Sequence, residues 1–431
     1  MFLHCLKMKH TLALLLILGT NVMTQNPCPY NVKECRCSAR TLLCTNLTGI
    51  PPLESTNQNG SITNLTFQSS NLNNITENSL PANLQTLVFS NVSITSISPN
   101  AFSNSSTTLT SFTMDQVSYD ELPDALLNVS GLTTLQLSNM NITGWPTDVL
   151  QYLGKTVRSV SLTNAGLTSW PQWLKDFTLV NSIDVSSNKL KTLPADAFKN
   201  VKSLKTLLLS STFLDDTGNL DFALAPVSNS LETLNISHNF FTQIPAGLVN
   251  MPRLSTLQIS FNLILEITPD TIPLSLTRLD LTDNLITELT NTSFPPSSAL
   301  KTLLLTFLQF TYLSDWAFQP LRNLTGLSLA YTNLETIPLA LTKLPNLQIL
   351  DLSMGGINLR CNCPVDGQLA RWYQSLRNLT VVGWCRNDFN TINVSTYLQN
   401  GKQLCSSGFD YLRGNLFLCL LVVMATAVYF W

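Results

Sequence analysis

Histidine is the side chain that most often acts as a catalytic base or a metal ligand, and this chain has very few. The three histidines are His4, His10 and His238, and the first two lie in an apolar leader. A Ser-His-Asp arrangement needs an imidazole with a carboxylate behind it, and a histidine-based metal site needs further ligands. Asp184, on a predicted strand, is two repeats away from His238, and glycine-rich phosphate loops are absent. We therefore predict no enzyme activity, no metal and no cofactor. An enzyme built on a pair of carboxylates is the disfavoured alternative.

Cysteine is the second reactive residue type, and the chain carries it in two groups of four. The first group has the spacing C-x6-C-x-C-x6-C and the second begins with Cys-Asn-Cys; the residues are Cys28, Cys35, Cys37 and Cys44, then Cys361, Cys363, Cys385 and Cys405. Clustered cysteines bind zinc or form disulfides, and four cysteines allow three disulfide connectivities. The secretory leader favours disulfides. We predict two disulfide-bonded caps, over residues 25–61 and 358–405.

A repeated sequence pattern fills the chain between the two caps, and it must position the remaining side chains. The pattern L-x-x-L-x-L-x-x-N-x-L recurs at steps of 22 to 27 residues, as in Leu231 to Asn239 and Leu276 to Asn284. The thirteen predicted starts are Ile62, Leu84, Leu109, Leu132, Val157, Val180, Leu204, Leu231, Leu254, Leu276, Leu300, Leu324 and Leu347. One repeat cannot bury its apolar face alone, so neighbours must stack. Residues 62–357 therefore predict an α/β solenoid, a right-handed leucine-rich-repeat coil of about 13 repeats. It would have a concave parallel sheet of short L-x-L strands. The phenylalanines of Asn100-Ala-Phe102, Asp196-Ala-Phe198 and Trp316-Ala-Phe318 are expected to fill its core.

The position of the N in the repeat pattern, which we call the asparagine slot, holds asparagine in only some repeats. Asn188, Asn239, Asn262 and Asn284 occupy it, whereas the other repeats carry residues such as Ser70, Val92 and Leu308. An asparagine amide can satisfy the buried backbone of the bend, which valine or leucine cannot do. We expect a continuous ladder only over the repeats from Leu231 to Leu276, with water or backbone bonds elsewhere and less regular curvature in the first half.

The caps and repeats together resemble the animal extracellular leucine-rich-repeat proteins with cysteine-flanking regions. This group includes the Nogo receptors, Slit, the small leucine-rich proteoglycans, Toll-like receptors and lamprey variable lymphocyte receptors, and the resemblance covers about residues 28 to 405. The resemblance implies four pairings: Cys28–Cys37, Cys35–Cys44, Cys361–Cys385 and Cys363–Cys405. It also implies a short helix at Leu369-Ala-Arg-Trp372. The Nogo receptors are the nearest architectural parallel, and no motif assigns a subfamily.

Both ends of the chain look like processing signals. Lys7 and Lys9 precede an apolar run over 11–18, which predicts a signal peptide over residues 1–24. Residues 406–431 carry the small triplet Ser406-Ser407-Gly408, a seven-residue spacer and an apolar tail. This order is typical of a glycosylphosphatidylinositol (GPI) attachment signal with Ser406 as the acceptor. A retained transmembrane helix is the alternative for the tail.

Glycosylation sequons are frequent and charge is scarce. Charged residues make up 12% of the chain, the formal net charge is −2, and no basic stretch predicts a nucleic-acid partner. The predicted N-glycosylation sites are Asn46, Asn59, Asn64, Asn74, Asn91, Asn104, Asn128, Asn141, Asn235, Asn291, Asn323, Asn378 and Asn393. Asn64 and Asn235 are expected on the concave face.

The later repeats carry large side chains just after each strand. We predict a ligand-binding patch there; its residues are Phe261, Arg278, Asp280, Asp283, Phe307, Tyr331 and Met354. The alternative is that these aromatic rings pack against the adjacent coil. The sequence thus predicts a non-enzymatic, GPI-anchored glycoprotein on the outer face of the plasma membrane. It would bind an extracellular protein ligand and signal only through a possible transmembrane co-receptor. A secreted or matrix structural glycoprotein is the alternative.

Overall fold

The computed structural model describes residues 28–54, 62–353, 359–386 and 391–400, and the chain divides into two compact units. The first unit holds the residues up to 119 and 123–132, and the second holds 120–122 and the residues from 133 onward. Several predicted features lie outside the described residues: the leader, Asn59, Met354, Cys405, Ser406 and the carboxy-terminal tail.

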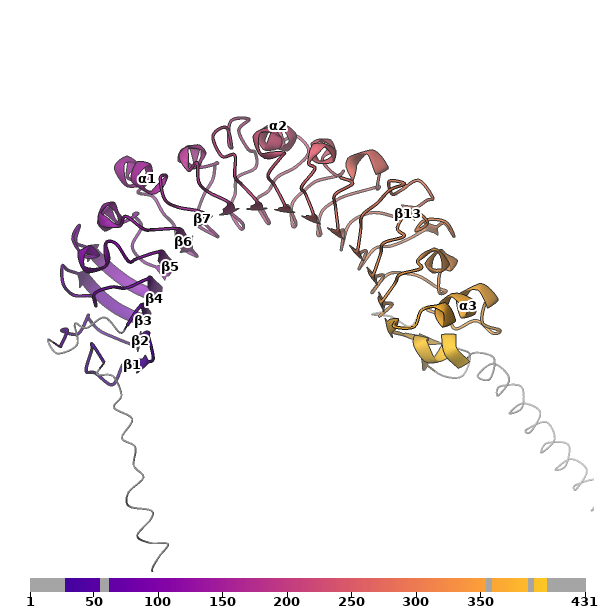
Figure 1. Cartoon of the computed structure of the whole chain (residues 1–431), viewed down its shortest axis with the longest axis horizontal. Helices are drawn as coiled ribbons and strands as arrows, with labels where there is room; N and C mark the ends of the chain where they lie inside the picture. The colour runs from indigo at the N-terminus through magenta and orange to yellow at the C-terminus, as the bar shows by residue number, and fades with distance from the viewer. Residues whose placement is uncertain (1–27, 55–61, 354–358, 387–390, 401–431) are drawn as a thin grey trace, which may run out of the picture. The chain divides into compact units, whose positions relative to one another are not determined.

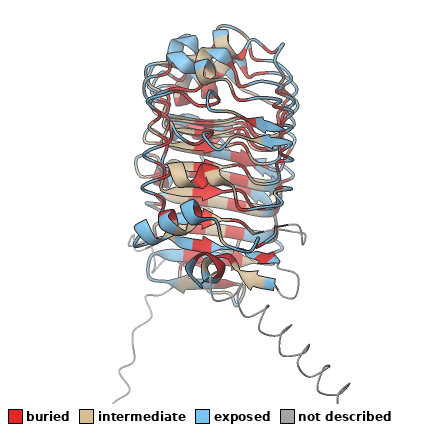
Figure 2. Ribbon diagram, turned by 90° about the vertical axis from the view of Figure 1, so that its right-hand side faces the viewer, coloured by how far each residue is buried: buried red, intermediate tan, exposed pale blue. Residues whose placement is uncertain are grey.

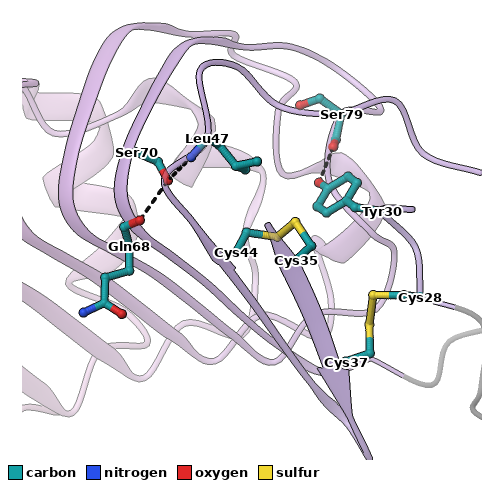
Figure 3. The surroundings of a disulfide bond; sticks show 9 residues. All are labelled: Cys28, Tyr30, Cys35, Cys37, Cys44, Leu47, Gln68, Ser70 and Ser79. Atoms are coloured by element: carbon teal, nitrogen blue, oxygen red, sulfur yellow. Dashed lines mark hydrogen bonds between the residues drawn. A yellow bond between two sulfur atoms is a disulfide. The ribbon is translucent and has the colours of Figure 1, made fainter. Parts of the chain in front are cut away.

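The first unit begins with a disulfide-bonded hairpin. Strand β1 (Cys35–Ser38) pairs antiparallel with β2 (Thr41–Thr45), and the bonds Cys28–Cys37 and Cys35–Cys44 hold it (Figure 3). Tyr30 packs under the hairpin, and its hydroxyl donates a hydrogen bond of 2.6 Å to the carbonyl of Ser79. The hairpin thus covers the end of the first coil, which would otherwise expose its core.

Parallel strands follow the hairpin in chain order. They are β3 (Asn64–Ile75), β4 (Thr86–Ile97) and β5 (Ser111–Val117), with the 3-10 helices η2 (Ser103–Ser105) and η3 (Asp124–Asn128). The expectation of short strands is wrong here, because β3 and β4 are each 12 residues long. Buried apolar residues continue past the slot in both strands, at Leu72 and Ile75 and at Ile94 and Ile97, so pairing also continues, with register shifts between Asn71 and Asn74.

The second unit has one parallel strand after another on its inner side (Figure 1). The strands are β6 (Thr134–Ser138), β7 (Ser159–Ser161), β8 (Ser182–Asp184), β9 (Thr206–Leu208), β10 (Thr233–Asn235), β11 (Thr256–Gln258), β12 (Arg278–Asp280), β14 (Thr302–Leu304), β16 (Gly326–Ser328), β17 (Ile349–Asp351) and β18 (Thr380–Val382). Most have three residues and pair in register, as the L-x-L pattern predicts. The predicted α/β leucine-rich-repeat solenoid is confirmed as the fold class.

Short helices and two small strands close the coils on the outer side of the second unit (Figure 1). They are α1 (Thr147–Leu153), η4 (Gln172–Asp176), α2 (Leu220–Leu224), η5 (Ala225–Val227), η6 (Ala246–Asn250), η7 (Pro269–Thr271), β13 (Glu288–Leu289), β15 (Tyr312–Leu313) and η8 (Leu339–Lys343). Figure 2 shows buried residues enclosed by the coils, with exposed residues around them. Phe102, Phe198 and Phe318 are at most 2% exposed, so their prediction as core residues is confirmed.

The asparagine slot is satisfied more widely than the sequence predicts. Asn239 accepts hydrogen bonds from the backbone N–H groups of Thr212 and Leu214 and donates to the carbonyls of Leu209 and Ile236. Asn188 makes the same kind of bonds two repeats earlier, outside the predicted ladder. Hydroxyl groups replace the amide at Ser70, Thr212 and Thr332. The expected restriction of the ladder to the repeats from Leu231 to Leu276 is therefore wrong, because a hydroxyl can also bond the bend.

The carboxy-terminal cap contains α3 (Gly367–Ser375), which spans the predicted helical segment, and the hairpin β19 (Trp384–Arg386) and β20 (Thr391–Asn393). Asp366 caps α3 by accepting hydrogen bonds from two backbone N–H groups. The Trp372 indole donates to the carbonyl of Leu344 over 3.0 Å and thereby ties the cap to the last repeats. Cys361 is bonded to Cys385, and Cys363 is also disulfide-bonded.

Candidate functional site

The strands β10, β11, β12, β14 and β16 each end in a turn with one left-handed residue. We call these five residues the turn row; they are His238, Phe261, Asp283, Phe307 and Tyr331, with φ between 50° and 60°. The backbone N–H of Phe261 donates to the carbonyl of Thr282 over 2.8 Å, and that of Phe307 donates to Ala330 over 3.0 Å. The stacked repeats therefore fix this backbone conformation at every coil.

Aromatic residues are costly at such positions. The left-handed region costs a non-glycine residue of the order of 1–3 kcal/mol, and Asn is tolerated there better than a bulky side chain. Earlier coils of the same unit carry small polar residues at the equivalent turns, namely Asn139, Asn164, Ser187 and Ser211. The aromatic side chains of the turn row therefore do not follow from the backbone conformation, and they need another explanation.

The turn-row rings stack on one another in pairs. The centroids of His238 and Phe261 are 4.2 Å apart with 7° between the ring planes, and those of Phe307 and Tyr331 are 4.7 Å apart with 13°. Phe261, Phe307 and Tyr331 nevertheless keep 41%, 45% and 44% of their surface exposed. Each ring thus packs against the adjacent coil and also presents a face to solvent. The packing alternative therefore holds in part, and the ligand-binding interpretation stays a prediction.

A second row of exposed apolar residues lies two positions further along the turns. This flank row consists of Phe213, Phe240, Leu263 and Leu285, which are 40% to 51% exposed. The four residues come from successive coils, which a parallel sheet spaces about 4.8 Å apart. The rings of Phe213 and Phe240 are 5.9 Å apart. This row was not predicted, although the sequence carries a simple signal of it. Each member directly follows the slot residue, a position where an exposed turn usually carries a polar side chain.

The predicted sheet residues of the patch are placed differently. Arg278 and Asp280 lie on β12, next to the turn that carries Asp283. Asp280 Oδ1 accepts a hydrogen bond of 3.0 Å from the backbone N–H of Thr282, so this carboxylate closes the end of its own strand. Arg278 is half-buried, and none of the ion pairs in the described part of the chain includes it. Met354 is the one predicted patch residue outside the described ranges.

The turn row offers aromatic and apolar contact. His238 stacks on the ring of Phe261, and none of the ion pairs among the described residues includes it. Within residues 28–54, 62–353, 359–386 and 391–400, no group of His, Cys, Asp or Glu is arranged to hold a metal ion. No helix in these same ranges has the length and apolar character needed to cross a membrane.

Among the sequons, one lies close to this surface. Asn235 ends β10, three residues before His238, and it points onto the sheet face between Leu208 and Gln258 of the neighbouring strands. Asn291 lies two residues after the outer strand β13, and Asn323 lies three residues before β16. A glycan at Asn235 would therefore stand beside the turn row.

Comparison with known proteins places the chain among repeat proteins. The family model described as "BspA type Leucine rich repeat region" matches residues 53–156 in six copies, and the model "Leucine Rich Repeat" matches residues 230–251. Podocan of Mus musculus is 26% identical over 242 residues, which are 54% of this chain and 34% of podocan. Lumican of Homo sapiens is 24% identical over 46% of this chain and 71% of lumican. The chain thus spans only a third of the length of podocan.

Solved structures share the fold at low sequence identity. The Toll of the Drosophila Toll–Spatzle complex has a TM-score of 0.60 and 18% identity, over 82% of this chain and 57% of that one. A leucine-rich-repeat protein of Leptospira interrogans has a TM-score of 0.54 and 19% identity, over 74% of this chain and 90% of that one. The repeats, the parallel sheet and these relatives agree: the chain is a leucine-rich-repeat protein whose repeats begin behind a disulfide-bonded cysteine cap.

Proposed function

We propose that this chain is a non-enzymatic recognition protein that binds an extracellular protein partner through the turn row and the flank row. The relatives are leucine-rich-repeat proteins, which supports a role in protein interaction in general. Repeat solenoids offer an extended surface that contacts a partner over several coils at once. The two rows occupy adjacent coils of the second unit, so one partner could contact both.

The observation that carries the proposal is the set of half-exposed rings at left-handed turns. Phe261, Phe307 and Tyr331 bear the conformational cost of these turns and still leave large apolar faces in water. Burying such faces against a partner contributes roughly 25 cal/mol per Å² of apolar surface. Rigid stacked rings also lose little side-chain entropy on binding, which is why aromatic residues dominate interface hot spots.

The charge of the surface suggests the chemistry of the partner. Among the nine residues of the two rows, Asp283 is the one carboxylate and His238 the one titratable base. Such a surface gives weak long-range steering, and affinity must come from apolar contact and shape. The partner is therefore expected to present an apolar and largely uncharged face.

A binding comparison tests this proposal. The full-length protein from mammalian cells is made multivalent and tested against a panel of purified secreted and cell-surface proteins. The variant Phe307→Ser/Tyr331→Ser should weaken binding by about 2 kcal/mol or more, which is about 30-fold in Kd. Phe222→Ser is the matched control, because Phe222 is 70% exposed but lies on α2 at the outer side. Equal binding by the folded double variant and the wild type would contradict the proposal.

The cellular location of the protein is a separate part of the proposal. A signal peptide over residues 1–24 and a GPI signal with Ser406 as acceptor would place the protein on the outer face of the plasma membrane. Signalling would then require a transmembrane co-receptor. Treatment of intact cells with phospholipase C should release the protein. Retention that only detergent overcomes would favour a retained helix, and protein already in the medium would favour the secreted or matrix alternative.

A further inference from the structure

A polar groove crosses the turns of the first unit, and it carries two of the sequons. The groove is shallow and widely open to solvent, and it has a volume of about 580 Å³. Asn46 follows β2 and Asn91 lies in β4, and both line the groove, as do the sequon hydroxyl residues Thr48 and Ser93. Both acceptor asparagines are exposed and left-handed, with φ of 58° and 53°.

Most residues that line this groove carry an amide or a hydroxyl group, Leu47 and Val92 add apolar surface, and none carries a formal charge. Ser69 lies between the two sequons, in the coil that separates them, and the Asn91 amide donates to its hydroxyl over 3.4 Å. Behind the surface, Ser70 accepts a hydrogen bond of 3.0 Å from the backbone N–H of Leu47 (Figure 3). The buried backbone is therefore already satisfied, and side chains such as Asn71 and Gln116 on the groove wall can hydrogen-bond a ligand.

We propose that this groove binds the first sugar residues of the chain's own N-glycans, linked to Asn46 and Asn91. N-Acetylglucosamine presents hydroxyl groups and an acetamide, which match uncharged donors and acceptors and need no ionic partner. The two acceptor asparagines are two coils apart, or about 10 Å at the usual strand spacing. The two sugars therefore enter the groove from its opposite ends. This inference does not depend on the proposed function, which concerns the second unit.

The covalent step is ordinary N-glycosylation. One Nδ2 hydrogen of each asparagine is exchanged for the anomeric carbon of an N-acetylglucosamine that a lipid-linked oligosaccharide donates, and the lipid diphosphate leaves with the proton. The Asn91 Nδ2 keeps one hydrogen for its bond to Ser69. Docking then needs little intrinsic affinity, because the covalent link gives the sugar an effective concentration in the millimolar range or above.

Docking should protect these two glycans from the enzymes that trim and extend them. If the effective concentration exceeds the Kd about tenfold, about nine-tenths of the glycan is docked and trimming slows about tenfold. Site-specific mass spectrometry of glycopeptides from the full-length protein secreted by mammalian cells tests this. Asn46 and Asn91 should retain oligomannose chains. Asn128, which lies on η3 and is not among the groove residues, should carry processed chains.

A substitution in the groove distinguishes docking of the glycans from other causes of slow glycan processing. Asn71→Leu replaces the amide by an apolar group with the same number of heavy atoms, while Asn71→Ser keeps a polar wall and serves as the control. Asn71→Leu should shift Asn46 and Asn91 toward processed chains about tenfold, to the level of Asn128, and Asn71→Ser should not. Unoccupied Asn46 and Asn91, processing equal to that of Asn128 in the wild type, or no response to Asn71→Leu in a protein with normal thermal stability would each overturn the inference.

Discussion

Asn235 and Asp280 flank Gln258 from its two sides and make the same hydrogen bond. Both pair in register with Gln258, Asn235 from β10 and Asp280 from β12. In each, Oδ1 accepts a backbone N–H two residues further on, from Ser237 over 2.9 Å and from Thr282 over 3.0 Å. Aspartate therefore fits this strand end as well as asparagine does, and the sequon at Asn235 can be removed without loss of the bond.

The variant Asn235→Asp should lose one glycan mass and keep its thermal stability. A glycan at Asn235 stands beside His238, so its removal is expected to raise the affinity for a partner about fivefold, which corresponds to about 1 kcal/mol. Mass spectrometry, a thermal melt and a binding titration with a partner from the protein panel measure the three effects. Asn291→Gln is the control, because it removes a sequon on the outer side. If both variants bind like the wild type, the sheet face beside β10 does not contribute to recognition.

Binding through the two rows should depend little on salt. The surface is nearly uncharged, and the Debye length falls from about 10 Å at 0.1 M to about 3 Å at 1 M, which weakens interactions between exposed charges. We expect the Kd to change less than about threefold over this range, and Arg278→Gln to bind like the wild type. A steep loss of affinity with salt, abolished by Arg278→Gln, would move the contact from the two rows to the charged residues of the sheet.

The asparagine slot should be a strong determinant of local stability. Asn239 is 4% exposed and makes five hydrogen bonds to the backbone of two coils. It accepts from the N–H groups of Thr212 and Leu214 and donates to the carbonyls of Leu209, Ile236 and Ser237. Asn239→Ala removes all five bonds and leaves two buried N–H groups without their acceptor, which costs about 3 kcal/mol or more. Asn333→Ala, at an exposed turn position, should cost at most about 0.5 kcal/mol. Urea unfolding gives the two free energies, and hydrogen exchange should show the loss of protection in residues 205–215. Equal stability of the two variants would show that water can replace the amide.

The periodic parts of this molecule were predictable from the sequence, and the reason is physical. A leucine such as Leu257 or Leu279 has one possible place in a stacked coil, so the repeat predicts both the short strands of the second unit and their parallel order. The twelve-residue strands β3 and β4 were not predicted, because the repeat pattern ends at the slot, whereas pairing there continues through Ile75 and Ile97.

The candidate site was predicted only in part. Phe261, Phe307 and Tyr331 were identified by their size, but the sequence does not show that Phe307 and Tyr331 stack or that all three turns are left-handed. The flank row was missed because Leu263 and Leu285 lie in apolar stretches, although each stands at the x position between the slot asparagine and the next repeat residue. The structure leaves them 40% and 51% exposed. Exposure depends on which way each turn points, and one repeat alone does not determine that.

Tyr30 should make the stability of the amino-terminal cap sensitive to alkali. Burial raises the pKa of the Tyr30 phenol far above its ordinary value of 10.0, and its hydroxyl donates to the Ser79 carbonyl (Figure 3). Because the folded-state pKa is raised, the neutral phenol stabilises the fold fully below the unfolded pKa. That stability is lost as pH rises above about 10, by at most about 1.4 kcal/mol per pH unit.

The variant Tyr30→Phe separates this effect from the other titrating groups. It keeps the ring beside Phe67, 6.3 Å away between centroids, but loses the bond to Ser79. At pH 7 it should be less stable by about 1 kcal/mol. Above about pH 10 the wild type alone has a buried phenol to ionise, so the gap between the two proteins should close and then reverse. Hydrogen exchange of the amides in residues 28–45, followed at both pH values, measures this gap. A gap that stays constant from neutral to alkaline pH would mean that Tyr30 ionises freely, and that the cap opens to water without unfolding.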